Sequence, residues 1–264
     1  MSRLRRRLPQ PRLLLAVTLT AALPLAPASA LAAPEEVQVY RDEVTPLHRF
    51  GVEINQSYVP AGPVEDIGPI AQVGLYRFTP ELDYGVAKDW EVGTLLDTTV
   101  RDGAFDAHGI KAHVRWIDPR PEDRPWYFGF NAEAGWSDRH VEERPWTVEL
   151  RGIAGWEGKR WVLAVNPTLE TAADGHGGEP VAFELQTKVG YRVSDKWLLG
   201  IESYNAFGPI AQIEPLDRQS QILYAAADTE WRGLDLNFGV GKGLTRDSDG
   251  WAVKAVIGIP LGAR

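Results

Sequence analysis

The sequence predicts an all-β fold, a transmembrane antiparallel up-and-down β-barrel of about twelve strands. The first of three observations is the stretch WYFGFNAEAGW, residues 126–136, in which every second residue is apolar and the residues between are polar or glycine. A strand places alternate side chains on opposite faces, so this stretch has one apolar and one polar face. The other two observations are the positions of the tryptophans and the alternation of short and long connections.

The same alternation recurs along the chain and defines the expected strands. Strong copies are WTVELRGIAGW (146–156), WVLAVNPTLE (161–170), VAFELQTKVGYR (181–192), LDLNFGVG (234–241) and WAVKAVIGI (251–259). Weaker copies lie at 48–58, 72–84, 90–100, 109–117, 197–205 and 221–231. Because no segment shows the 3.6-residue period of an amphipathic helix, we expect strands throughout.

The tryptophans lie at or near the ends of these strands. Ten residues separate Trp126 from Trp136, and ten separate Trp146 from Trp156. At about 3.3 Å per residue and a tilt of about 40°, ten residues rise about 25 Å, the height of the apolar band of a membrane barrel. A soluble sandwich or lipocalin-like barrel would instead place tryptophan at mid-strand in its core. We therefore expect an aromatic girdle of Trp126, Trp136, Trp146, Trp156, Trp161, Trp197 and Trp251.

The connections alternate in length in the way that membrane barrels require. Short ones are GVAKD, DPRPEDR, EGK, VSDK and RG, whereas the others, which are mostly longer, cover 59–71, 101–108, 137–145, 171–180, 206–220 and 243–250. In outer-membrane barrels the short turns face the periplasm and the longer loops face the outside. The pattern therefore predicts a barrel in the outer membrane of a Gram-negative bacterium.

The first 32 residues have the features of a cleaved secretory signal peptide. A basic stretch, SRLRRRLPQPR, precedes the apolar LLLAVTLTAAL and the small residues ASALA. Pro24 and Pro27 interrupt the apolar run, which favours cleavage after Ala30 or Ala32 over a membrane-anchoring helix. We expect a signal peptide at 1–32, an N-terminal periplasmic segment at 33–45 and the barrel at 46–264.

Charge and cysteine content narrow the possible partners. The chain has 28 basic and 36 acidic side chains, and the signal peptide holds five of the arginines and no acidic residue, so the expected mature chain has a net charge of −13. An acidic protein of this kind is a poor partner for nucleic acid. The chain has no cysteine, which excludes disulfides and thiolate metal sites. The expected partners are outer-membrane lipid, the barrel-insertion machinery and a small permeant.

Alternation also assigns charged side chains to the lumen. They either pair across the barrel and make it rigid, or they line a passage and select what crosses it. Twelve strands lie between the eight that side chains fill and the sixteen that leave an open channel. The candidate lumen residues are Glu53, Arg77, Glu81, Glu91, Lys111, His113, Arg115, Glu133, Glu149, Arg151, Glu184, Lys188, Glu202 and Asp235.

Catalytic and metal motifs are weak. A lipid hydrolase needs a serine and a histidine together near one rim, but Ser203, which has lipid-face parity, has no histidine on its own or an adjacent strand. DGHGGE (174–179) and DSDG (247–250) are more typical of polar turns than of metal loops, because no bidentate glutamate follows DSDG. We therefore expect no catalytic residue, no metal and no cofactor.

Three hairpin sequences resemble a known family. LDYGVAKDWEVG (82–93), VGYRVSDKWLLGIESYN (189–205) and GVGKGLTRDSDGWAVKAVIG (239–258) are similar to hairpins of the bacterial outer-membrane barrels named for the MetA pathway of phenol degradation. The resemblance covers most of the expected mature chain and implies uptake of aromatic or other small hydrophobic compounds. The chain departs from such barrels at its end, IGIPLGAR, where they usually have an aromatic residue.

From these observations we expect a passive, porin-like outer-membrane channel for small molecules, with hydrophobic or aromatic compounds as candidate permeants. The alternatives are a barrel that does not conduct and acts structurally or through its loops, and an outer-membrane lipid hydrolase.

Overall fold

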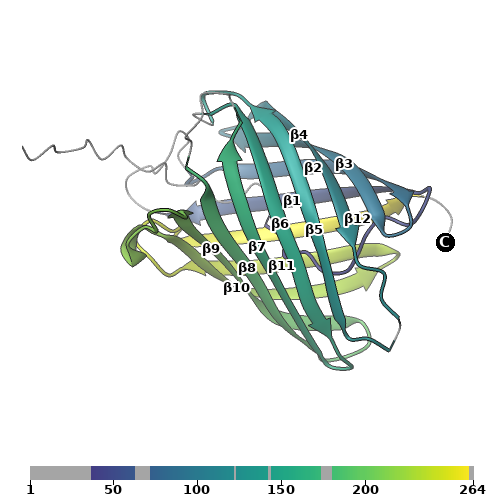
Figure 1. Ribbon diagram of the computed structural model, residues 1–264. Helices are drawn as coiled ribbons and strands as arrows, with labels where there is room; N and C mark the ends of the chain where they lie inside the picture. The colour runs from purple at the N-terminus through teal and green to yellow at the C-terminus, as the bar shows by residue number, and fades with distance from the viewer. Residues whose placement is uncertain (1–36, 63–71, 122, 142–143, 174–179, 262–264) are drawn as a thin grey trace, which may run out of the picture.

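The computed structural model is a closed barrel of twelve antiparallel strands (Figure 1). It describes residues 37–62, 72–121, 123–141, 144–173 and 180–261. The expected signal peptide lies outside these residues. The strands are β1 (Phe50–Ala61), β2 (Tyr76–Ala87), β3 (Trp90–Arg101), β4 (Ala104–Ile117), β5 (Trp126–Ser137), β6 (Trp146–Glu157), β7 (Trp161–Ala172), β8 (Ala182–Arg192), β9 (Trp197–Pro209), β10 (Ser220–Trp231), β11 (Leu234–Gly243) and β12 (Trp251–Leu261).

Each strand pairs with its sequence neighbours, and β1 pairs with β12 to close the barrel. The closing ladder runs from Phe50 opposite Leu261 to Ala61 opposite Trp251. The predicted fold class is therefore confirmed, and every predicted strand overlaps an observed one. A short 3₁₀ helix, η1 (Leu216–Arg218), lies in the connection before β10.

Within the described residues, no helix is both long enough and apolar enough to cross a membrane.

One predicted long loop is wrong. Residues 101–108 were expected to form a loop, but β3 ends at Arg101 and β4 begins at Ala104, so only Asp102 and Gly103 connect them. Both residues have positive φ, 51° and 80°. An Asp-Gly pair with two positive φ angles is the preferred two-residue hairpin turn, because its twist matches that of the flanking strands. The Asp102–Gly103 turn therefore lets β3 and β4 continue as a hairpin through most of the stretch in which the alternation of loop lengths predicted a long loop.

The two ends of the barrel differ, as predicted. The connections at 88–89, 118–125, 158–160, 193–196 and 232–233 define the short-turn end. The other end, which we call the long-loop end, has its longest connections at 62–75 and 210–219. Strand β1 begins, at Phe50, at the short-turn end.

The outer surface is apolar and has tryptophans where the strands end. Trp126 lies opposite Trp156, and Trp136 lies opposite Trp146, at the two ends of the β5–β6 ladder. Trp126 is 54% exposed and Trp146 is 55% exposed on the barrel exterior. An indole at such a position keeps its N–H near water and its ring in the lipid boundary. Between the two pairs, Leu150 points outward and is 52% exposed.

Leu150→Arg should destabilise the barrel by about 2–4 kcal/mol in unfolding titrations in lipid, because it places a cation at the bilayer midplane. The matched control is Leu244→Arg, since Leu244 is also exposed but lies in the connection between β11 and β12. The control should change the free energy of unfolding by less than 1 kcal/mol, about the cost near the interface. A larger cost for Leu244→Arg than for Leu150→Arg would contradict the assignment of the lipid-facing band.

Candidate functional site in the barrel lumen

The lumen is lined by charged and polar side chains, and it contains a part of the chain that precedes β1. Of the fourteen predicted lumen residues, eight are buried: Arg77, Glu81, Glu91, His113, Arg115, Arg151, Lys188 and Glu202. A further five are partly buried: Glu53, Lys111, Glu133, Glu149 and Glu184. Asp235 is exposed and lines a cavity at the short-turn end. The alternation thus places the predicted charges on the inner wall.

The expected N-terminal segment enters the lumen at residues 37–45. Tyr40 is its centre: the backbone N–H of Tyr40 donates to Asn166 Oδ1 at 2.7 Å, and Asn166 Nδ2 donates to the Tyr40 carbonyl at 3.1 Å. Two guanidinium groups lie over the Tyr40 ring: that of Arg115 is 4.0 Å from the ring centroid and that of Arg151 is 4.7 Å from it. Because β4, β6 and β7 all contribute to this binding site, the segment crosses the interior of the barrel.

Further contacts hold both ends of this lumen segment, which we define as residues 37–45. Lys254 of β12 donates from Nζ to the Val37 carbonyl at 2.8 Å, and Gln38 donates to Glu53 of β1 at 3.1 Å. At the other end the Thr45 N–H donates to Glu91 Oε2 at 2.5 Å. Side chains of the inner wall therefore satisfy backbone groups at Val37, Tyr40 and Thr45, as burial of a loop requires.

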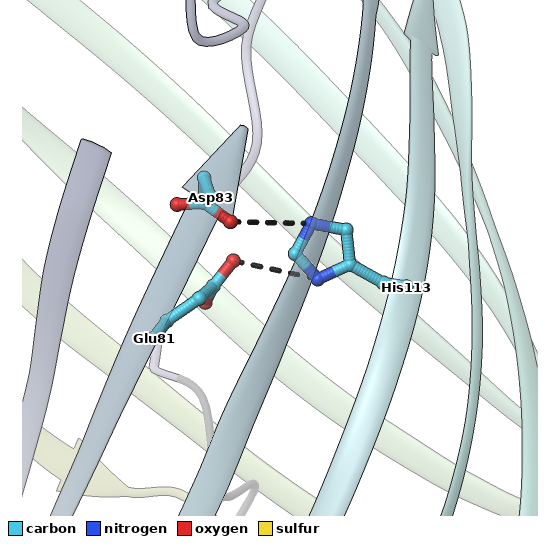
Figure 2. A group of neighbouring side chains, drawn as sticks. All are labelled: Glu81, Asp83 and His113. Atoms are coloured by element: carbon cyan, nitrogen blue, oxygen red, sulfur yellow. Dashed lines mark ion pairs between the residues drawn. The ribbon is translucent and has the colours of Figure 1, made fainter. Parts of the chain in front are cut away.

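A first group of ionisable residues, the histidine cluster, lies on β2, β3 and β4. Figure 2 shows Glu81 and Asp83 pointing toward the two ring nitrogens of His113. His113 Nδ1 is 3.5 Å from Glu81 Oε1, and Nε2 is 3.4 Å from Asp83 Oδ1. Glu91 Oε1 lies 3.6 Å from the same Nε2 and 3.1 Å from Arg115 Nη1. The histidine cluster comprises these five residues.

A second group, the lysine cluster, lies on β8 to β12. Glu202 is at its centre: it forms an ion pair with Lys254, lies 3.0 Å from Lys188 Nζ, and accepts the Tyr204 hydroxyl at 2.8 Å. Lys188 also pairs with Asp228 at 2.6 Å. Buried charges persist only when they are paired and hydrogen-bonded, and this cluster satisfies that requirement.

Other predicted lumen charges pair along or between strands. Arg151 Nε donates to Glu149 at 3.0 Å, and Lys111 Nζ lies 3.5 Å from Glu133. Glu184 accepts a hydrogen bond from Gln186 at 3.0 Å. Many of the predicted lumen charges are thus paired, as expected if they make the barrel rigid. Selection of a permeant would be an additional role of the same side chains.

Sequence reasoning missed the lumen segment and its partners. No site role was predicted for Tyr40 of the segment, for Asn166, which binds it, or for Tyr204, which hydrogen-bonds to Glu202 in the lysine cluster. Asn166 has inward parity within β7, so its position was available from the alternation. Its partner was not, because Tyr40 and Asn166 are 126 residues apart and no local pattern links them.

Of the two possible metal motifs in the sequence, the one at 247–250 lies in the connection before β12 and contains no member of either cluster. Residues 174–179 lie outside the described residues. In the 247–250 connection Ser248 Oγ accepts the Gln221 N–H at 2.7 Å and donates to the Gln221 carbonyl at 3.0 Å, which holds this loop against β10. Asp249 is buried there, and burial raises its pKa from the ordinary value.

Solved structures with the same fold come from bacterial outer membranes. An outer membrane channel from Pseudomonas putida F1 matches with a TM-score of 0.57 at 15% identity, over 86% of this chain and all (100%) of that chain. The NanC porin matches with a TM-score of 0.55 at 8% identity, over 80% of this chain and 100% of that chain. The fold is that of outer-membrane barrels. At these identities the likeness establishes the fold alone.

Comparison of the sequence with protein-family models finds no match, and comparison with curated proteins finds none that is significantly similar.

At the long-loop end, His140 joins the loop after β5 to β4. Its Nδ1 lies 2.8 Å from Asp138 and its Nε2 2.7 Å from Asp106. Hydrogen bonds to Asp138 and then Asp106 raise the pKa of His140 above its ordinary value. Because the pKa of His140 is higher in the folded state, the contact contributes its full stability below a pH of about 6.5, the unfolded-state pKa. This contribution is lost as pH rises through the folded-state pKa.

We therefore expect an NMR titration of His140 to give a pKa above about 6.5. Asp106→Asn should lower that pKa, because it removes one of the two carboxylates. Asp102→Asn is the matched control, since Asp102 is exposed in the adjacent turn and has no contact with His140 among the described residues. An equal drop in both variants, or none in Asp106→Asn, would show that the contact does not form.

Proposed function

We propose that this protein is a passive channel for small molecules in the outer membrane of a Gram-negative bacterium, with the lumen segment acting as its plug. The signal peptide would export it, the barrel-insertion machinery would place it, and lipid would surround the apolar exterior. Two outer-membrane proteins of the same fold, one named a channel and the other a porin, support this location and role.

The observation that carries the proposal is the way in which the lumen segment is bound. Its contacts to Asn166, Lys254 and Glu91 are hydrogen bonds to single side chains, not strands of the barrel ladder. Each such bond contributes about 0.5–1.5 kcal/mol net, or up to about 3 with a charged partner. Release of the segment would therefore open the lumen while the barrel stays intact.

The inner wall also supports the hydrophobic or aromatic permeants that the family resemblance implies. Tyr204, Ile222 and Tyr224 form a buried apolar patch with Val39 of the lumen segment. Tyr204 and Tyr224 contact each other with ring centroids 5.3 Å apart. If Val39 withdraws with the segment, this patch becomes a surface on which a small aromatic compound can pack.

A non-conducting barrel is the second candidate, and the ion pairs that hold the clusters together favour it. Lys188, Glu202 and Lys254 link β8, β9 and β12 through the interior. A wall held in this way resists deformation and would serve a structural or loop-binding role.

We further propose that the protein is not a lipid hydrolase. Ser203, the serine with outward parity, hydrogen-bonds with Asn205. Among the described residues no contact joins Ser203 to a histidine, so the general base that an acyl-transfer site needs is not in place. A lipase assay on the detergent-solubilised protein tests this directly.

Planar-bilayer recording tests the plug. A variant lacking residues 37–45 should show a single-channel conductance several-fold above that of the wild type, and Asn166→Ala should show more frequent openings. Asn205→Ala is the matched control, because Asn205 also donates to a backbone carbonyl, that of Leu185 at 3.0 Å, but outside the lumen segment's site. A correctly folded deletion variant that passes no current would favour the non-conducting barrel.

The open lumen should favour cations weakly. Alternation over all twelve strands, a wider set than the fourteen candidates named above, gives about twelve inward acids against about eight bases. Carboxylates lower the barrier to cation entry. The preference should fade at high salt, where the Debye length falls to about 3 Å at 1 M. In reversal-potential measurements on the variant lacking residues 37–45, Glu133→Lys should reduce it, because Glu133 faces the lumen beside Lys111.

The matched control for Glu133→Lys is Asp195→Lys, since Asp195 is exposed in the turn between β8 and β9. The same charge change there should leave the reversal potential nearly unaltered. A clear anion preference of the variant lacking residues 37–45 at low salt would show that Arg and Lys side chains line the narrowest part instead.

A further inference from the structure

The histidine cluster depends on a row of three residues across three strands. Asp83 of β2 lies opposite Gly93 of β3, and Gly93 lies opposite His113 of β4. A Cβ atom at Gly93 would come within 2.2 Å of Asp83 Oδ1 and 2.4 Å of His113 Cε1. The absence of a side chain at Gly93 therefore lets Asp83 and His113 meet directly above β3.

The two distances from His113 Nε2 to carboxylate oxygens fit metal coordination better than hydrogen bonding. His113 Nε2 is 3.4 Å from Asp83 Oδ1 and 3.6 Å from Glu91 Oε1, and neither ring nitrogen forms a hydrogen bond with a described residue. N–H···O bonds are normally about 2.7–3.2 Å long. In contrast, ligands about 2.0–2.2 Å from a tetrahedral Zn²⁺ lie about 3.3–3.6 Å apart.

We propose that the lumen holds a divalent transition-metal ion, such as Zn²⁺, between His113 Nε2 and the carboxylates of Asp83 and Glu91. Glu81 faces Nδ1, on the other side of the ring, at 3.5 Å. A metal-binding histidine usually donates its second N–H to a carboxylate, which fixes the tautomer and orients the ring. We therefore assign Glu81 as a positioning residue, whose carboxylate would accept the Nδ1 N–H once the bound ion fixes the ring. The mixed nitrogen and oxygen ligands suit Zn²⁺ or Mn²⁺ better than Ca²⁺, which takes oxygen ligands only.

The side chains are buried, and their charges favour a cation. The side chain of His113 is 0% exposed, and those of Glu81 and Glu91 are 1% and 2% exposed. Three carboxylates face one guanidinium, that of Arg115, which leaves two negative charges in excess when His113 is neutral. Glu53, opposite Glu81 on β1, adds a further negative charge. A divalent ion would offset the excess at this buried site.

The ion has a route to this site. A cavity of about 420 Å³ at the short-turn end is lined by Asp83, Glu91 and Arg115 and by Thr45 and Pro46 at the end of the lumen segment. Glu91 presents Oε1 to His113 and Oε2 to the Thr45 N–H. The metal would therefore share a ligand with the lumen segment, beside the point where the segment enters the barrel.

The proposal is independent of conduction and is tested by binding. The full mature chain, refolded in detergent and freed of metal with a chelator, is titrated with ZnCl₂ by calorimetry. Co²⁺ gives a second readout through its visible absorption. We expect one high-affinity equivalent and an absorption spectrum typical of four-coordinate Co²⁺. His113→Gln and Asp83→Asn should abolish this equivalent, and Glu81→Gln should weaken it by about 10–100-fold.

Gly93→Ala tests the geometry without removing a ligand, because its Cβ would separate Asp83 from His113; it should also lose the equivalent. His140→Gln is the matched control, since His140 lies between two carboxylates at the long-loop end. It should retain the lumen equivalent, and circular dichroism verifies the fold of every variant. If His113→Gln fails to fold, Asp83→Asn and Glu81→Gln decide. A folded wild type that binds no Zn²⁺, or binding lost only in His140→Gln, would overturn the proposal.

Discussion

Closure of the strand ladder is the constraint on which the rest of the structure depends. Lipid offers no hydrogen-bond partner, so each backbone group within the membrane must bond to a neighbouring strand. The β1–β12 ladder, from Phe50 opposite Leu261 to Ala61 opposite Trp251, removes the two edges that an open sheet would leave. With the backbone groups bonded in this way, the alternation of the strand alone decides whether a side chain faces lipid or the lumen. Apolar ones such as Leu150 face lipid, and charged ones such as Glu202 face inward.

The inward charges create a second requirement, because an ion removed from water needs a partner. The inner wall meets it in two ways. Within the lysine cluster, Glu202 is shared by Lys188 and Lys254. The lumen segment supplies further partners: Lys254 also donates to the Val37 carbonyl, and Arg115 and Arg151 lie over the Tyr40 ring. Such cation–π contacts contribute about 0.5–2 kcal/mol each, so together they can hold a segment in place without fixing it permanently. The same polar wall therefore suits both a plug and a passage.

The strands and their faces could be predicted from the sequence because both follow from local alternation. The turn at Asp102–Gly103 shows where one local rule overrode another: Asp-Gly favours a two-residue hairpin, whereas loop-length alternation favoured a loop. The lumen segment could not be predicted, because Tyr40 finds Asn166 across the interior and not along the chain. The candidate lumen residues followed from parity, but parity does not tell which of them meet. That depends on register, strand by strand.

Register explains why the histidine cluster has no sequence motif. Asp83, Gly93 and His113 are separated by ten and twenty residues in the chain, spacings that no metal-binding signature uses. They become one row only through the pairing of β2 with β3 and of β3 with β4. A slip of one residue in either ladder would turn one member toward lipid. The bulge between Asp97 and Thr98 lies on the long-loop side of this row and leaves it intact. In a barrel, hairpin lengths thus decide which lumen side chains lie in one row, and glycines such as Gly93 let side chains on the two flanking strands approach each other.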